Sequence, residues 1–247
     1  MERPFERRTA ARTAVVWEAV GAVLEGRPGA RVLDIGGGTG GFAVRLAGLG
    51  HQVTVVDPSP DALAALARRA DEAGVADQVA GLQGDLADLG ALVPDDDVDL
   101  VLCHGVLGLV ADPVAALGTI AAALRPGGTL SLLVSQQHAA VLARAMAGHL
   151  TQARALLEGT PTTADQRTDQ RAAERRFTAE EIGDLLESAG FALTAVQGIR
   201  VFSDLVPSTL LDLEPGAATA LLDLERAVAE RPEYLTLAAQ LHTLATR

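Results

Sequence analysis

The stretch Val32-Leu-Asp-Ile-Gly-Gly-Gly-Thr-Gly-Gly41 decides the fold of this chain. A short apolar strand leads into an acid and then into a nearly continuous run of glycine, where the next helix should begin. Because glycine lacks Cβ, such a turn can adopt positive φ and bring its backbone amides against a ligand, at a cost in folding entropy. The turn is therefore predicted to bind a small molecule at the carboxyl end of the first strand of a βαβ unit.

The acid inside this turn indicates which ligand binds there. Gly36, Gly38 and Gly41 match the dinucleotide pattern G-x-G-x-x-G, in which a pyrophosphate lies on the first amides of a helix. The carboxylate of Asp34 would repel a pyrophosphate but would suit a zwitterionic ligand of net positive charge. S-adenosylmethionine (SAM) is such a ligand, and the spacing Asp34-x-Gly36-x-Gly38-x-Gly40 favours it. A dinucleotide such as NAD remains the alternative.

A second acid ends the following strand. The run His51-Gln-Val-Thr-Val-Val-Asp57 is rich in β-branched residues and is bounded by Gly50 and Pro58. An acid at this spacing from a glycine turn typically accepts both hydroxyls of a ribose, so Asp57 is predicted to do so. The alternative is that Asp57 only caps the helix that begins near Ser59.

Strands and helices alternate along the chain, which predicts an α/β fold with a doubly wound, mostly parallel sheet. Ligands bind such sheets at the carboxyl ends of the strands, where Asp34, Asp57, Asp85 and His104 all fall. The expected strands after the first are 53–56, 79–83, 98–103, 130–135, 191–201 and 234–246, and the expected helices include 9–25, 61–73, 113–124 and 216–231.

The length of 247 residues fits one domain spanning 1–247. Within it, residues 1–28 are expected to form an N-terminal helical cap. The regular rhythm breaks over 136–176, and an insertion after a core strand commonly forms a lid or a substrate wall. Thr178 and Glu181 have the spacing of a capping box, which predicts that a new helix begins there.

The net charge of −12 makes the chain a poor non-specific binder of nucleic acid, because phosphate contacts supply most of that affinity. Local clusters of basic residues can override the average charge. All basic residues are arginine, and two clusters stand out, namely Arg3, Arg7, Arg8 and Arg12, and Arg167, Arg171, Arg175 and Arg176.

The single cysteine, Cys103, leaves no partner for an internal disulfide and no Cys-based metal site, and it is expected to be an inert core residue. No apolar stretch approaches the length of a membrane span, and the N-terminus does not resemble a signal peptide. We therefore expect a cytoplasmic protein that binds neither membrane nor metal.

The order of the glycine turn, Asp57, Gly84-Asp85 and Arg125-Pro-Gly-Gly128 resembles the class I SAM-dependent methyltransferases. That resemblance implies a seven-stranded Rossmann-like sheet that ends in an antiparallel hairpin. Over almost the whole chain, the sequence is similar to one family of that class, the tRNA 5-carboxymethoxyuridine methyltransferases. The similar segments are Arg12–Trp17, Val32–Gly38, Gly50–Val53, His104–Pro113, Leu124–Leu132, Gly198–Phe202 and Glu233–Leu237.

The resemblance implies roles for residues of the cofactor site. Arg12 would hold the SAM carboxylate, since a guanidinium can bind a carboxylate through two parallel hydrogen bonds. By the same resemblance, the other contacts would come from the backbone of Gly36 and Gly37, from Asp57 at the ribose, from Leu86 and Ala87 at the adenine, and from His104 beside the methionine moiety. Asp34, Gly38 and Asp85 complete the candidate cofactor site.

The implied reaction is methyl transfer to a substrate carboxylate. A carboxylate is already a nucleophile near neutral pH, so no general base is required, and catalysis rests on aligning oxygen, methyl and sulfur. Arg200 is the leading candidate to bind the substrate anion, with Tyr234, His138 and His242 as further substrate-orienting candidates. The alternative for Arg200 is a buried strand arginine paired with an acid.

The acceptor stays open on sequence grounds. After the fifth strand the tRNA enzymes carry an aromatic pair and an asparagine, which could stack on a base, whereas this chain reads Val134-Ser135-Gln136. A small-molecule methyltransferase is therefore an alternative to a tRNA enzyme. An NAD-dependent oxidoreductase and a non-catalytic SAM-binding protein are alternatives of other classes.

Overall fold

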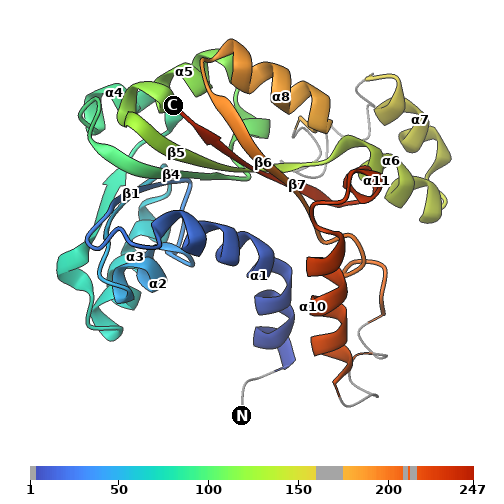
Figure 1. Cartoon of the computed structure of the whole chain (residues 1–247), viewed down its shortest axis with the longest axis horizontal. Coiled ribbons are helices and arrows are strands. Elements are labelled where there is room, and N and C mark those ends of the chain that lie inside the picture. The colour runs from blue at the N-terminus through green and yellow to red at the C-terminus, as the bar shows by residue number, and fades with distance from the viewer. Residues whose placement is uncertain (1–3, 160–174, 208–210, 212–215) are drawn as a thin grey trace. The chain divides into compact units, whose positions relative to one another are not determined.

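The computed structural model describes residues 4–159, 175–207, 211 and 216–247, with side chains from residue 13 onward. Seven strands form one sheet in the order β3-β2-β1-β4-β5-β7-β6 (Figure 1). They are β1 (Arg31–Ile35), β2 (Gln52–Asp57), β3 (Val79–Gln83), β4 (Val98–His104), β5 (Leu124–Ser135), β6 (Ala192–Ile199) and β7 (Gln240–Thr246). Strands β1 to β5 pair in parallel, and the C-terminal strands are antiparallel. The predicted fold class is confirmed.

Contacts between residues divide the chain into two compact units. We call residues 23–133, 183–194 and 243–247 the glycine-turn unit, and residues 1–22, 134–182 and 195–242 the Arg200 unit. Each unit has an organisation of its own.

In the glycine-turn unit, β1 lies between β2 and β4, and its apolar side chains are buried. Helices α2 (Ala43–Gly48) and α3 (Pro60–Glu72) pack against β2 and β3, while α4 (Leu89–Leu92) and α5 (Pro113–Ala123) lie on the other face of the sheet (Figure 1). The helices begin where capping side chains allow it. Ser59 accepts a hydrogen bond from the Ala62 amide at the start of α3, and Asp112 accepts two amides at the start of α5.

The Arg200 unit is mainly helical outside its strands. Its helices are α6 (Gln137–Met146), α7 (Leu150–Leu157), α10 (Ala217–Val228) and α11 (Pro232–Leu235), and α1 (Pro4–Leu24) and α8 (Ala179–Ser188) begin in it. The capping box that opens α8 is confirmed. The Thr178 amide donates to Oε2 of Glu181 at 2.8 Å, and the Glu181 amide donates to Oγ1 of Thr178 at 3.1 Å.

Two predicted strand boundaries are wrong. The last strand begins at Gln240, and Tyr234 instead lies in α11, because Pro232 occupies the first turn of a short helix, where its missing N–H costs nothing. Strand β5 begins at Leu124 and includes the Arg-Pro-Gly-Gly segment. An irregularity in the β4–β5 pairing, from Val98↔Leu124 to Leu100↔Thr129, accommodates the extra residues.

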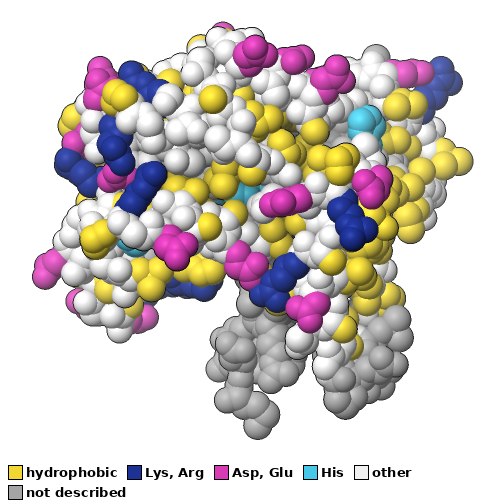
Figure 2. All heavy atoms as spheres, in the orientation of Figure 1, with side chains coloured by type: hydrophobic (Ala, Val, Ile, Leu, Met, Phe, Trp, Pro, Cys, Tyr) yellow, Lys and Arg dark blue, Asp and Glu magenta, His cyan; other side chains and the backbone are white. Residues whose placement is uncertain are grey.

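The predicted lid over 136–176 contains α6 and α7. Residues 160–174, which include Arg167 and Arg171, lie outside the described part of the chain. Four large apolar side chains on or beside these helices are exposed, and Figure 2 shows apolar atoms gathered there. They are Leu142, Met146, Leu150 and Leu157. No described helix is both long and apolar enough to cross a membrane.

Candidate functional site

The glycine-turn unit brings acidic and imidazole side chains to one edge of its parallel strands. Asp34 lies near the end of β1, Asp57 ends β2, and His104 ends β4. Asp85 follows β3 directly after Gly84, whose amide donates to the carbonyl oxygen of Asp57 at 3.3 Å. The prediction that these residues share the carboxyl edge is confirmed.

The glycine turn itself needs glycine for two reasons. Gly36, Gly38 and Gly40 have φ values of 67°, 55° and 81°, a region that residues with a Cβ rarely adopt. A Cβ on Gly37 would lie only 2.5 Å from Oδ2 of Asp34, so the backbone at this position packs directly over the buried carboxylate. The turn is a backbone surface supported from below by Asp34.

Asp57 ties this turn to the start of α3. Its Oδ2 accepts the Gly38 amide at 2.9 Å, and its Oδ1 accepts the Ser59 amide at 2.9 Å. The N-cap of α3 is Ser59, so Asp57 is not simply the helix cap. A carboxylate can accept about four hydrogen bonds, so beyond the two from the Gly38 and Ser59 amides Asp57 can accept about two more.

The pKa of Asp34 is strongly perturbed. The residue is 4% exposed. Burial, and then the negative charge of Asp57, raise the pKa of Asp34 from 3.8 to about 7. Two neighbouring carboxylates in a poorly solvated place favour a ligand that brings positive charge, because such a ligand stabilises their ionised forms.

The loop after β3 is held by a second reciprocal cap. Oδ1 of Asp85 accepts the Ala87 amide at 2.7 Å, and Oδ2 of Asp88 accepts the Asp85 amide at 3.0 Å. The Leu86 side chain is buried, whereas Ala87 is exposed. The Asp85 carboxylate therefore shapes the loop that carries the two residues predicted to contact adenine.

His104 is positioned by two residues that the sequence did not single out. Its Nε2 lies 2.9 Å from Oγ of the buried Ser131 on β5. The ring of Phe42, which directly follows the glycine turn, meets the imidazole edge to face at 5.0 Å between centroids. The position of Phe42 immediately after Gly41 is the signal that could have found it.

The remaining predicted cofactor residue, Arg12, lies in α1, but its side chain is outside the described part of the structure. The side chains of Arg7 and Arg8 are outside it as well, and Arg3 is not among the described residues. In the parts of the chain that the structure describes, no group of three or more His, Cys, Asp or Glu side chains is arranged to hold a metal ion. Cys103 is fully buried, and burial raises the pKa of its thiol to about 12, so it remains an unreactive core residue.

All four substrate-orienting candidates lie in the Arg200 unit. Arg200 follows β6 with φ of 63°, and its side chain, 28% exposed, forms an ion pair with Asp204. It is thus paired with an acid, but it is partly exposed and lies after the strand rather than inside it. His138 is exposed, and its Nδ1 lies 3.2 Å from Nε2 of Gln136.

The Tyr234 ring forms part of a small core cluster. It meets the ring of Phe202 edge to face at 6.0 Å, and both pack against Val201, Val228 and Ala238. The ring therefore has a packing role at the base of the turn that carries Arg200.

The expectation that His242 orients a substrate is wrong for this structure. Its side chain is 0% exposed, and Nδ1 lies 3.1 Å from Oε1 of Gln197. Burial lowers the pKa of His242 to about 4, so the ring is neutral at physiological pH. Gln197 in turn donates from Nε2 to Glu230 at 3.1 Å, which fixes the orientation of its amide. His242 is a buried structural residue.

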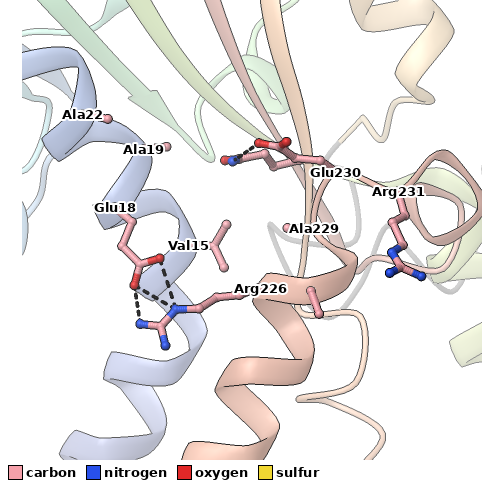
Figure 3. A pocket seen from close by; sticks show the side chains of 10 residues that line it. Val15, Glu18, Ala19, Ala22, Arg226, Ala229, Glu230 and Arg231 are labelled. Atoms are coloured by element: carbon pink, nitrogen blue, oxygen red, sulfur yellow. Dashed lines mark hydrogen bonds and ion pairs between the residues drawn. The ribbon is translucent and has the colours of Figure 1, made fainter.

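A pocket of about 460 Å³ opens within the Arg200 unit between α1 and the end of α10 (Figure 3). Glu18 on α1 and Arg226 on α10 form an ion pair on one wall, and Gln197 and Glu230 lie on another. Small apolar side chains such as Ala19 line the pocket between these polar groups. None of the predicted substrate-orienting residues lines this pocket.

Sequence reasoning also missed Glu225. This acid on α10 is 3% exposed, and its carboxylate accepts the amides of residues 201, 202 and 203. A single glutamate in an amphipathic helix carries no sequence signal that distinguishes it from a surface acid, because its partners are distant along the chain.

Comparison with known proteins gives consistent results. The family described as "Methyltransferase domain" matches residues 7–196. The tRNA 5-carboxymethoxyuridine methyltransferase of Escherichia coli O157:H7 is 32% identical over 238 residues, covering 96% of this chain and 88% of that protein. A ubiquinone biosynthesis O-methyltransferase of Xanthomonas campestris pv. campestris (strain B100) is 38% identical over 133 residues, covering 54% of each. A solved SAM-dependent methyltransferase from Mesorhizobium loti, 22% identical, superposes with a TM-score of 0.61 over 94% of this chain and 97% of that one.

Proposed function

The chain belongs to the methyltransferase-domain family and is a SAM-dependent methyltransferase, and from this premise we propose that it methylates a carboxylate, that of 5-carboxymethoxyuridine at the tRNA wobble position. One observation carries the choice of acceptor. The similarity to the tRNA enzyme runs over 96% of this chain, whereas the matches to ubiquinone biosynthesis O-methyltransferases of Xanthomonas cover between 54% and 74% of it. A match over nearly the whole chain includes the parts that select an acceptor as well as those that bind SAM.

The cofactor supplies an electrophilic methyl group on its sulfonium, and the residues at the carboxyl edge fit a ligand of this charge. Asp57 would use its remaining acceptor positions for the ribose hydroxyls, and the backbone of Gly36 and Gly37 would contact the methionine portion. Asp34 would act through the turn, since Gly37 covers its carboxylate and its raised pKa favours a nearby cation.

The remaining cofactor contacts would come from the loop after β3, from the end of β4 and from α1. The loop after β3 is capped by Asp85, and its Leu86 and Ala87 would contact the adenine. His104, held between Phe42 and Ser131, would lie beside the methionine moiety, and Arg12 would bind the SAM carboxylate.

The residues of this chain have little chemistry to perform beyond positioning. A substrate carboxylate with an ordinary pKa near 4 would be ionised at neutral pH, so it would need no general base from this chain in order to accept a methyl group. Rate enhancement then depends on holding oxygen, methyl and sulfur in line. Arg200 would hold the carboxylate, because guanidinium groups bind carboxylates through charge-assisted hydrogen bonds.

Labelling tests the proposal. The protein is incubated with SAM carrying a radioactive methyl group and with tRNA from a strain that lacks the 5-carboxymethoxyuridine methyltransferase. We expect label in tRNA, and nucleoside mass spectrometry should identify the methyl ester of 5-carboxymethoxyuridine. Transfer RNA without the carboxymethoxy group is the matched control and should take up no label. If the tRNA of the first incubation takes up no label, the tRNA assignment is refuted.

A small-molecule acceptor is the second candidate, and two observations favour it. The net charge of −12 opposes RNA binding. In addition, this chain lacks the aromatic pair and asparagine that the tRNA enzymes carry after the fifth strand, and its Gln136 is 2% exposed and accepts the Ala139 amide at the start of α6. Label in a low-molecular-weight extract but not in tRNA would select this candidate. SAM binding with no labelled acceptor in either extract would select a non-catalytic SAM-binding protein.

A further inference from the structure

The turn between β6 and α10 holds its arginine in an unusual conformation. Arg200 has φ of 63°, in the left-handed region that residues with a Cβ seldom occupy. Only one other residue with a Cβ, Asp96, has positive φ in the described part of the chain. Such a conformation persists only where the surroundings over-determine it, and it is often found at functional sites.

Glu225 provides those surroundings. Its Oε2 accepts the Val201 amide at 2.9 Å, and its Oε1 accepts the amides of Phe202 and Ser203 at 3.0 and 2.7 Å. Three successive amides that begin directly after Arg200 thus converge on one buried carboxylate. Successive N–H groups next to a left-handed residue form a concave site for an anion, and here the anion comes from the chain itself.

The guanidinium of Arg200 has a hydrogen-bond donor that is unpaired among the described residues. It forms an ion pair with Asp204 through Nη2, but its Nε is buried and has no hydrogen-bond partner among the described residues. Buried polar groups in proteins are nearly always paired, so an unpaired donor on a cation indicates a place for an anionic ligand.

We propose that Glu225 is a positioning residue for the acceptor: by binding the three amides that follow Arg200, it holds the Arg200 guanidinium in the orientation that receives the substrate carboxylate. The inference deepens the proposed function and rests on it. Glu225 itself does not touch the substrate, because its carboxylate is buried and occupied by the turn.

Glu225→Gln is the discriminating substitution. The amide oxygen of glutamine can keep the bonds from residues 202 and 203, but its NH₂ group would then face the Val201 amide, donor against donor. The lost bond is the one nearest Arg200. We expect the KM for 5-carboxymethoxyuridine tRNA to rise about tenfold, because one charge-assisted bond is replaced by an unsatisfied amide. The Kd for SAM should stay within about twofold of wild type.

Ser203→Ala is the matched control. It removes the Ser203 hydroxyl, which also donates to Oε1 of Glu225, but leaves all three backbone bonds in place. If the three backbone hydrogen bonds fix the orientation of Arg200, this variant should keep a KM for the tRNA within about threefold of the wild-type value.

A double-mutant cycle with Arg200→Gln separates positioning from a general structural role. If Glu225 acts through Arg200, then Glu225→Gln should change KM by less than about twofold once Arg200 has been replaced. Independent, multiplicative effects of the two substitutions would overturn the inference. Should Glu225→Gln not fold, Glu225→Asp retains the buried charge but cannot span the three amides, and the same cycle is run with it.

The outcomes distinguish the two levels of the argument. If the wild-type protein methylates the tRNA and the cycle shows no coupling, the positioning role fails and the proposed function stands. If the wild-type protein does not methylate this tRNA, the proposed function fails and the inference about its acceptor fails with it.

Discussion

The buried carboxylate of Asp34 leads to a quantitative prediction about folding stability. Burial, and then the charge of Asp57, raise its pKa from 3.8 to about 7. Between these pH values the folded chain binds a proton that the unfolded chain has released, so the free energy of unfolding falls as the pH rises through this window. At about 1.4 kcal/mol per pH unit, the full loss from this group is about 4 kcal/mol.

Asp34→Asn removes the ionisable group and nearly preserves its shape. We expect the free energy of unfolding of the variant, minus that of wild type, to increase by about 1.4 kcal/mol per unit between about pH 5 and pH 7 and to level off above about pH 8. Urea unfolding followed by circular dichroism measures it, and taking the difference cancels the other titrating groups. A difference that does not change across this range would refute the raised pKa and the electrostatic argument for a cationic ligand.

The same carboxylate should make cofactor binding depend on pH. A cation bound beside Asp34 favours its ionised form, so the Kd for SAM should rise as the pH falls below about 7. Asp34→Asn should bind SAM more weakly and without this dependence. Isothermal titration calorimetry on both sides of neutrality measures the effect, and an unchanged pH dependence in the variant would assign the titration to another group.

Three further predictions concern other residues. SAM should raise the melting temperature of the wild-type protein and NAD should not. Asp57→Ala should abolish this shift, because it removes the acceptor of the Gly38 amide and of the proposed ribose contacts, and a shift preserved in the variant would exclude a role of Asp57 in SAM binding. Burial lowers the pKa of His242 from 6.5 to about 4, so between these pH values the unfolded chain binds a proton that the folded chain does not. The free energy of unfolding should therefore fall by about 3 kcal/mol as the pH drops through this interval. His242→Gln should remove that loss in urea unfolding at acid pH, and an equal pH dependence of the unfolding free energy in both proteins would contradict the buried neutral ring. Arg200→Gly should melt about 2–4 °C higher than Arg200→Ala, because glycine adopts the left-handed φ of this position with about 1 kcal/mol less strain than alanine does; equal melting temperatures would argue against strain at this turn.

The fold could be predicted because its signals are local. The β-branched run that ends at Asp57 is bounded by Gly50 and Pro58, and the capping box of Thr178 and Glu181 predicts the start of a helix. In each case the residues that make the signal lie within a few positions of one another. The alternation of such segments then leaves few ways to assemble a parallel sheet.

The wrong boundaries have a different origin. The segment Tyr234-Leu-Thr-Leu237 has the composition of a strand, but Pro232 and the turn after α10 favour a short helix, and the strand starts only at Gln240. At β5, pairing with β4 extends the strand across a proline and two glycines that by themselves indicate a stop. Tertiary pairing overrides local preference at both places.

The placement of the candidate site residues could be predicted from the sequence, but the state of their side chains could not. The residue pattern predicts that Asp34, Asp57 and His104 lie at the carboxyl edge of the sheet, whereas their hydrogen bonds and the pKa of Asp34 depend on burial, which the tertiary structure sets. His242 illustrates the opposite error. A histidine near a predicted site was expected to contact substrate, yet it is completely buried.

Apart from Arg12, the cofactor candidates and the acceptor candidates lie in different units. The other cofactor candidates lie in the glycine-turn unit, whereas Arg12, Arg200 and Glu225 lie in the Arg200 unit. It follows that Asp57→Ala should impair SAM binding, while Glu225→Gln should impair acceptor binding and leave the Kd for SAM unchanged. If both substitutions impaired SAM binding equally, this division of roles between the units would be wrong, and the acceptor could not be inferred from the Arg200 unit.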